Sequence, residues 1–206
     1  MNKLVPVLGT AGAGLAGGGA AWASGVFSKD EAIRNKLREE KYEVLSASAK
    51  EHWDKILDSY KKPQNKWGFE GQKIENISQL QNVCKSSITS NYSDTIYKAI
   101  TKWCVVPRTA ENLLGDSVSL LGVDDTKTDD QASWKHNVDA YSQAKTGNTY
   151  SLKDVTFTDS QEGENTKKLK AGCKTRRGKF TYDVDLDDSI AEIKKWCLAK
   201  TQSPQE

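Results

Sequence analysis

The stretches TKWCV (101–105) and KKWCL (194–198) place the tripeptide Lys-Trp-Cys twice in a chain that has only six Trp and four Cys. The likeness extends when residues 92–105 and 185–198 are aligned without gaps. Five positions are then identical: Asp94 and Asp187, Ile100 and Ile193, Lys102 and Lys195, Trp103 and Trp196, and Cys104 and Cys197. One repeated Trp-Cys pair has little weight, so the sequence upstream decides whether the chain contains a repeat.

Two further landmarks precede each Lys-Trp-Cys in the same order. A Cys-Lys pair lies at 84–85 and again at 173–174, and WDKILDSY (53–60) matches WKHNVDAY (134–141) at its Trp, Asp and Tyr. The offset between the copies grows from 81 to 89 to 93 residues, so the second copy contains insertions. Because all four cysteines take part, we predict a tandem, diverged duplication.

Each Lys-Trp-Cys is expected to end a short helix on its buried face. Apolar residues recur at helical spacing in both copies: Ile96, Ala99, Ile100, Trp103 and Cys104 in the first, and Ile190, Ile193, Trp196 and Cys197 in the second. Ser93 or Asp94 can cap the first of these helices, and Pro107 prevents its continuation. The tryptophans are therefore expected in the core rather than in a ligand site.

The cysteines are predicted to form disulfides. The sequence contains no C-x-x-C, and only His52 and His136 add imidazoles, which disfavours a zinc site. No metal and no cofactor is expected. Four cysteines allow three pairings, which the sequence alone does not distinguish. The duplication favours Cys84–Cys104 and Cys173–Cys197, because each copy then closes itself.

Residues 1–27 differ from the rest of the chain. From Leu4 to Phe27 the chain has 24 residues without a charge. As a helix they would span about 36 Å, enough to cross a bilayer. In water the seven glycines would each cost a helix about 1 kcal/mol relative to Ala, whereas membrane helices tolerate small residues. We predict a transmembrane signal anchor over 4–27, with an extracellular body.

The same segment has two other interpretations. Ala21-Trp22-Ala23 resembles a signal-peptidase site, so the alternative is a protein secreted after cleavage near Ala23. The spacing G-x-G-x-x-G occurs at 12–17, but it lies near the start of the chain and continues as small apolar residues. A dinucleotide site needs a preceding strand and a following amphipathic helix, so this motif does not predict one.

The organisation follows from the repeat. We expect copy 1 at 28–107, a connector at 108–129, copy 2 at 130–199 and a tail at 200–206. A capping box at 28–31 predicts a helical run to about Lys61 with a break at Ser46–Ser48, and a second helix is expected near 130–145. The alternating residues Phe180, Tyr182, Val184 and Leu186 predict a strand. The expected fold class is α+β, mainly α.

The charges are balanced, with 30 basic and 28 acidic residues, so no nucleic-acid partner is expected. One stretch stands out as a candidate anion patch for acidic glycans; it contains Lys167, Lys168, Lys170, Lys174, Arg176, Arg177 and Lys179. The favoured interpretation of this stretch is a solvated loop. Asp183, Asp185, Asp187 and Asp188 lack the Gly and Glu that a calcium loop requires.

The whole layout resembles the large paralogous families of uncharacterised proteins in haemotropic mycoplasmas. The resemblance is carried by a Gly/Ala-rich N-terminal membrane segment, a Lys-rich body and the Lys-Trp-Cys at 195–197. It implies a membrane-anchored surface protein that acts in host contact or antigenic variation, with a host surface protein or glycan as partner. It implies no catalytic residues.

The expected function is therefore that of an interaction protein at the cell surface. The alternative is a secreted module that binds anions or glycans through Lys167–Lys179. A cell-envelope enzyme is a remote third hypothesis, because the sequence has no catalytic signature and we expect no enzyme activity.

Overall fold

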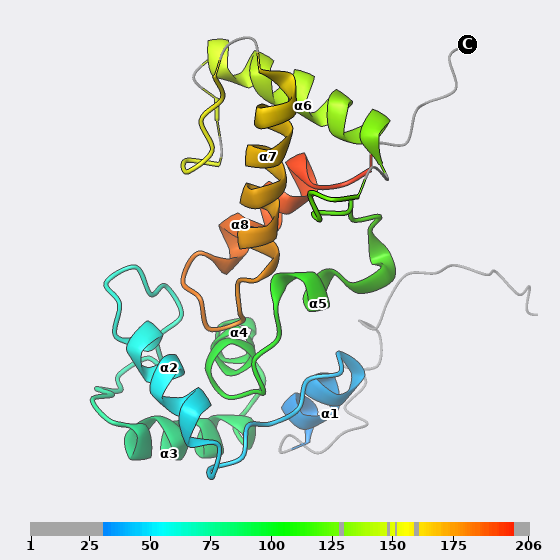
Figure 1. Cartoon of the computed structure of the whole chain (residues 1–206). Coiled ribbons are helices and arrows are strands. Elements are labelled where there is room, and N and C mark those ends of the chain that lie inside the picture. Colours follow the sequence, from blue (N-terminus) through cyan, green and yellow to red (C-terminus); the bar gives the residue numbers. More distant parts are fainter. Residues whose placement is uncertain (1–30, 128–129, 148, 151, 159–160, 200–206) are drawn as a thin grey trace, which may run out of the picture.

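The computed structural model describes residues 31–127, 130–147, 149–150, 152–158 and 161–199. In these ranges the chain is mainly helical (Figure 1). The helices are α1 (Ala32–Glu39), α2 (Lys50–Tyr60), α3 (Ile77–Ile88), α4 (Asp94–Trp103), α5 (Ala110–Leu114), α6 (Gln131–Thr146), α7 (Glu162–Arg177) and α8 (Leu186–Trp196), with a 3-10 turn η2 (Gly115–Ser117) after α5. Among the described residues, β-pairing is limited to three isolated antiparallel bridges, so the mainly helical class is confirmed.

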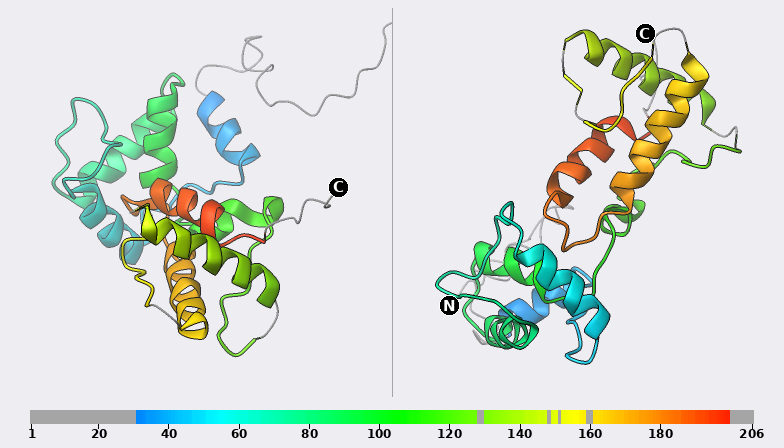
Figure 2. Two further views of the ribbon diagram at one scale, coloured as in Figure 1. Left: turned by 90° about the horizontal axis from the view of Figure 1, so that it is seen from above. Right: turned by 60° about the vertical axis from the view of Figure 1, so that its left-hand side comes forward.

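The helices surround two hydrophobic clusters. The first cluster comprises the buried apolar residues of 33–105 together with Tyr182, and the second cluster comprises those of 110–197 other than Tyr182. In Figure 2 helices α1–α4 lie at one end of an elongated molecule and α6–α8 at the other. Residues 108–129, expected as a connector, contribute Ala110, Leu114 and Leu121 to the second cluster.

Both predicted disulfides are present. Cys84 is bonded to Cys104 and Cys173 to Cys197, with sequence separations of 20 and 24 residues. Each bond joins the body of one helix to the end of the next, α3 to α4 and α7 to α8. Loops of this length lose enough conformational freedom in the unfolded chain for each bond to contribute about 3 kcal/mol.

The two clusters are built with the same contacts. The carbonyl of Cys104 accepts from Leu45 N at 2.9 Å, and that of Cys197 accepts from Leu121 N at 3.0 Å. In each case the carbonyl of the residue after the leucine accepts a hydrogen bond from a tryptophan indole. Trp53 donates to Ser46 O and Trp134 donates to Gly122 O, both at 2.9 Å. In each cluster a tyrosine ring also packs edge-on against the tryptophan of Lys-Trp-Cys. The ring centres of Tyr60 and Trp103 are 5.2 Å apart, and those of Tyr141 and Trp196 are 4.8 Å apart.

Several helix boundaries agree with the sequence. Ser93 is the N-cap of α4, where its hydroxyl accepts from Ile96 N at 3.2 Å. Helix α6 covers the range expected for the first helix of copy 2. The predicted break at Ser46–Ser48 falls between α1 and α2. The capping box at 28–31 lies mostly outside the described residues.

The predicted strand at 180–186 is wrong. Phe180 makes only an isolated bridge with Thr109, and Leu186 already begins α8. Asp183 explains the difference, because its carboxylate accepts from Phe180 N and its own N–H donates to Phe180 O, both at 2.8 Å. These bonds close a turn, which a short alternation of apolar residues does not reveal.

This turn joins the two clusters. We call the contact between 106–110 and 179–183 the junction. Its backbone bonds are Ala110 N to Lys179 O at 2.7 Å and Thr181 N to Arg108 O at 2.8 Å. Lys102 extends from α4 and donates to the carbonyls of Thr181 and Asp183, at 3.2 and 2.6 Å.

Candidate binding sites

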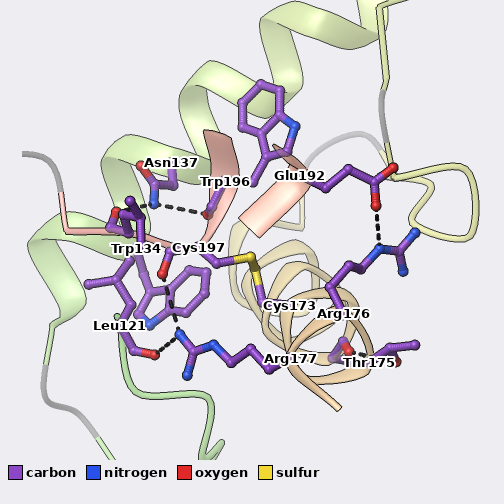
Figure 3. Close-up of a disulfide and its surroundings, with 12 residues drawn as sticks. Leu121, Trp134, Asn137, Cys173, Thr175, Arg176, Arg177, Glu192, Trp196 and Cys197 are labelled. Carbon is purple, nitrogen blue, oxygen red and sulfur yellow. Dashed lines mark hydrogen bonds and ion pairs between the residues drawn. A yellow bond between two sulfur atoms is a disulfide. The ribbon is translucent and has the colours of Figure 1, made fainter. Parts of the chain in front are cut away.

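The basic residues predicted as an anion patch lie almost entirely on α7, a helix rather than the expected loop. Three of them, Lys170, Arg176 and Arg177, are buried. Arg176 and Arg177 extend in different directions from the helix (Figure 3). Arg176 Nε donates to Glu192 at 2.7 Å, and its guanidinium also pairs with Asp154. Burial opposes the charge of Arg176, but the hydrogen bonds that it donates to Asp154 and Glu192 raise its pKa.

Arg177 has a structural role. Its Nη2 donates to the carbonyls of Leu121 and Cys197, at 2.5 and 3.3 Å (Figure 3). The side chain is 6 % exposed, and burial lowers its pKa, with Glu111 at 3.9 Å as a weak counter-charge. Arg177 therefore holds together the loop before α6 and the end of α8, and it is not available to a ligand.

The remaining members of the patch each have a different environment. Lys167 pairs with Glu164 and Lys179 with Asp185, both at 2.8 Å. Lys168 and Lys170 donate to backbone carbonyls, of Thr156 and of Asp124, both at 3.2 Å. Lys174 is exposed. The seven residues therefore do not form one cationic surface.

A different group of lysines does come together. A cavity of about 640 Å³, which we call the lysine hollow, is lined by Lys127, Lys135, Lys167 and Lys170. Trp134 forms part of its wall, and Asp125 and Glu162 are the acidic residues of its lining. Lys135 pairs with Glu162 at 3.4 Å, so the positive charge is partly compensated. The lining residues still carry more positive than negative charge.

A second cavity lies where the clusters meet. This junction cleft, about 400 Å³, is lined by Tyr42, Trp67, Lys98, Lys102 and Asp187 among others. Lys98 and Lys102 are engaged there, since the Lys98 ammonium lies 4.7 Å from the ring centre of Trp67 and Lys102 binds two carbonyls. Burial lowers the pKa of Lys102 against the opposing effect of Asp187, Asp183 and Asp185.

Residues with metal or catalytic potential do not assemble in the described part of the chain. His52 and His136 are both exposed, on α2 and α6. No group of three His, Cys, Asp or Glu residues is placed there to hold a metal ion. None of the helices in the described ranges has the length and hydropathy of a membrane span, and the predicted anchor at 4–27 lies outside those ranges.

No family model, curated protein or solved structure matches this chain. The chemistry of its sites must therefore be inferred from its own side chains.

Sequence reasoning did not find the lysine hollow. Lys135 follows the repeated Trp134 directly, and Lys127 lies in the expected connector. Their approach to Lys167 and Lys170 depends on the packing of α6 against α7. The spacing of lysines along each segment carries no signal for that contact, because the two helices meet only in the tertiary structure.

Proposed function

We propose that this protein is a membrane-anchored interaction protein whose body lies outside the cytoplasmic membrane. The observation that carries the proposal is that all four cysteines are paired, in Cys84–Cys104 and Cys173–Cys197. Structural disulfides form and persist in oxidising compartments and are rare in the cytosol. Residues 4–27 would serve as the anchor, and secretion after cleavage near Ala23 is the alternative.

We further propose that the body consists of two diverged copies of one disulfide-closed helical unit. The support is the matching set of contacts around the two disulfides: the leucine bonded to the cysteine carbonyl, the tryptophan indole bond and the tyrosine–tryptophan contact. The resemblance to surface proteins of haemotropic mycoplasmas adds the proposal that the body acts in host contact or antigenic variation.

The first test is a non-reducing peptide map of the protein isolated from its own membrane, combined with protease treatment of intact cells. We expect the two disulfide-linked peptide pairs and cleavage within 31–199 before lysis. Four free thiols, or a body that protease reaches only after lysis, would contradict the proposed location. Linked peptides with a body cut only after lysis would still place it in an oxidising compartment, but not at the surface.

A second candidate function is binding of an anionic ligand such as an acidic glycan. The observation that favours it is the lysine hollow, with Lys127, Lys135, Lys167 and Lys170 around one cavity. Phosphate- or sulfate-bearing chains bind clustered cations with a strong dependence on salt. This candidate uses α7 together with α6 and the loop before it, rather than the whole of 167–179.

The test is retention on immobilised heparin. We expect the double variant Lys127→Glu/Lys167→Glu to elute at clearly lower salt than the unaltered protein, because it reverses two charges at the hollow. The matched control is Lys85→Glu/Lys174→Glu, which makes the same charge change at exposed positions outside the hollow. Equal losses in both variants would indicate attraction by net charge only and would refute a site at the hollow.

A further inference from the structure

The two disulfide-linked helix pairs carry grooves at the same register. The α3–α4 groove is lined by Ser86, Ser87, Thr95, Ile96 and Ala99, and the α7–α8 groove by Thr175, Arg176, Asp188, Ser189 and Glu192. Counted from the cysteines, these are the same positions: two and three residues after the first Cys, and nine, eight and five before the second. The side chains at these positions therefore decide what each groove holds.

The α7–α8 groove is filled by its own side chains. Arg176, 9 % exposed, crosses it to Glu192, and Asp154 approaches the same guanidinium from the loop before α7. Lys179 and Asp185 form a further ion pair in the lining, at 2.8 Å. The remaining space is about 390 Å³. The charges of Arg176, Glu192, Asp154, Lys179 and Asp185 are therefore paired within the groove.

The α3–α4 groove lacks this filling. Ser87 stands at the position of Arg176 and Ala99 at that of Glu192, and the space is about 550 Å³. This volume lies within the range of small-molecule sites, about 300–1,000 Å³. The fold therefore leaves a groove open in the first cluster at the place where the second cluster closes one.

The lining of the α3–α4 groove is polar but almost uncharged. Its walls combine apolar groups of Phe69, Val83 and Ile96 with the amides of Gln72 and Asn82, and Glu70 is its only charged residue. The side chains of Gln72, Asn82, Ser87 and Thr95 make no hydrogen bond to any other residue that the structure describes, in contrast to Ser86, which donates to Val83 O at 3.0 Å. Donors and acceptors are thus both free at one apolar-walled groove.

We propose that the α3–α4 groove binds an uncharged saccharide. Neighbouring sugar hydroxyls each donate and accept a hydrogen bond, and side-chain amides, hydroxyls and a carboxylate offer both functions. The apolar C–H face of a sugar ring suits the walls formed by Phe69, Val83 and Ile96. Anionic ligands are disfavoured because Glu70 would repel them and the lining holds no cation to pair with them. This site is separate from the lysine hollow and does not depend on the location of the protein.

The test uses the full chain in detergent, with both disulfides intact. Saturation-transfer-difference NMR would be recorded with glucose, galactose, mannose and N-acetylglucosamine, and with sialic acid as the charged probe. We expect binding of at least one neutral sugar in the millimolar range and none of sialic acid. Absence of binding for every neutral sugar, or preference for sialic acid, would overturn the proposal.

The site is then tested by Ser87→Arg/Ala99→Glu, which copies into the first groove the pair that fills the second. We expect binding to weaken by about tenfold or more. Ser78→Arg is the control, because Ser78 is exposed on α3 and outside the groove. Asn82→Leu, an exposed change on the same helix, provides a second test that does not depend on a new ion pair. Unchanged affinity in the double variant or in Asn82→Leu would place the sugar elsewhere.

Discussion

At the residue scale, buried polar side chains of this protein hold loops to helices by donating to backbone carbonyls. Arg177 and Lys102 do so as cations. Tyr141 does so as a neutral phenol, whose single O–H is shared between the carbonyls of Leu152 and Val155, at 3.0 and 3.1 Å from its oxygen. A buried carbonyl that loses its donor costs about 1–3 kcal/mol. These contacts are therefore more important to stability than the surface ion pairs, which contribute about 0–1 kcal/mol each.

Tyr141→Phe tests this role and its pH dependence. At neutral pH we expect the free energy of unfolding to fall by about 1–3 kcal/mol, because the buried carbonyls of Leu152 and Val155 lose the one O–H donor that they share. Burial, and next the neighbouring Tyr150, raises the pKa of Tyr141 above its ordinary value of 10.0. The unfolded chain therefore releases this proton first, and stability falls as the pH rises above about 10.

Urea unfolding between about pH 8 and pH 11 checks both parts, since this interval spans the ordinary tyrosine pKa. The variant is expected to lose less stability than the unaltered protein over the alkaline part, because it has no phenol proton to release at this position. If the free energies of unfolding of the two proteins fell by the same amount over this pH range, Tyr141 would not contribute to the alkaline loss of stability.

At the element scale, α7 is fixed against the loop 152–158 by a close approach at Gly172. A Cβ at this position would lie 2.5 Å from Cγ2 of Val155, which is itself buried. Val83 stands at the corresponding position before Cys84, so the first cluster does not need this approach. The glycine lets the loop that carries Leu152 and Val155 close the second cluster.

Gly172→Ala is expected to lower the free energy of unfolding by about 1–3 kcal/mol, as overpacking does in a filled core. Gly163→Ala is the matched change on the same helix, and a Cβ there meets no atom within 4 Å. It should stabilise by up to about 1 kcal/mol, because Ala favours the helix over Gly. Thermal or urea unfolding of the two variants gives the comparison, and equal effects would argue against the close approach as the cause.

At the scale of the whole molecule, the two clusters are joined by few contacts. Tyr182 belongs to the first cluster although it lies between α7 and α8, and Lys102 reaches from α4 to the carbonyls of Thr181 and Asp183. The junction cleft lies beside these contacts. The net charge of the chain is close to zero, but the charged side chains are unevenly distributed. The lysine hollow lies in the second cluster, and the almost uncharged α3–α4 groove lies in the first.

Local sequence patterns predicted the main helices, and the expected duplication favoured the disulfide pairing that the structure has. All four cysteines lie at matching points of two similar segments, so of the three possible pairings the one that closes each segment was favoured. Ser93 caps α4, and the apolar spacing places Trp103 and Trp196 in the core. These features depend on neighbours along one helix or on a covalent bond, which local patterns encode.

The roles of the charged and polar residues depend on the tertiary structure. Lys102 and Lys195 are identical in the aligned sequence, yet Lys102 is buried at the junction and Lys195 is exposed. Arg176 and Arg177 are adjacent members of a basic stretch, yet one fills a groove and the other binds two carbonyls inside the second cluster. The partners of these side chains come from segments far away in the chain, and a charge is satisfied by whatever the fold brings within hydrogen-bond distance.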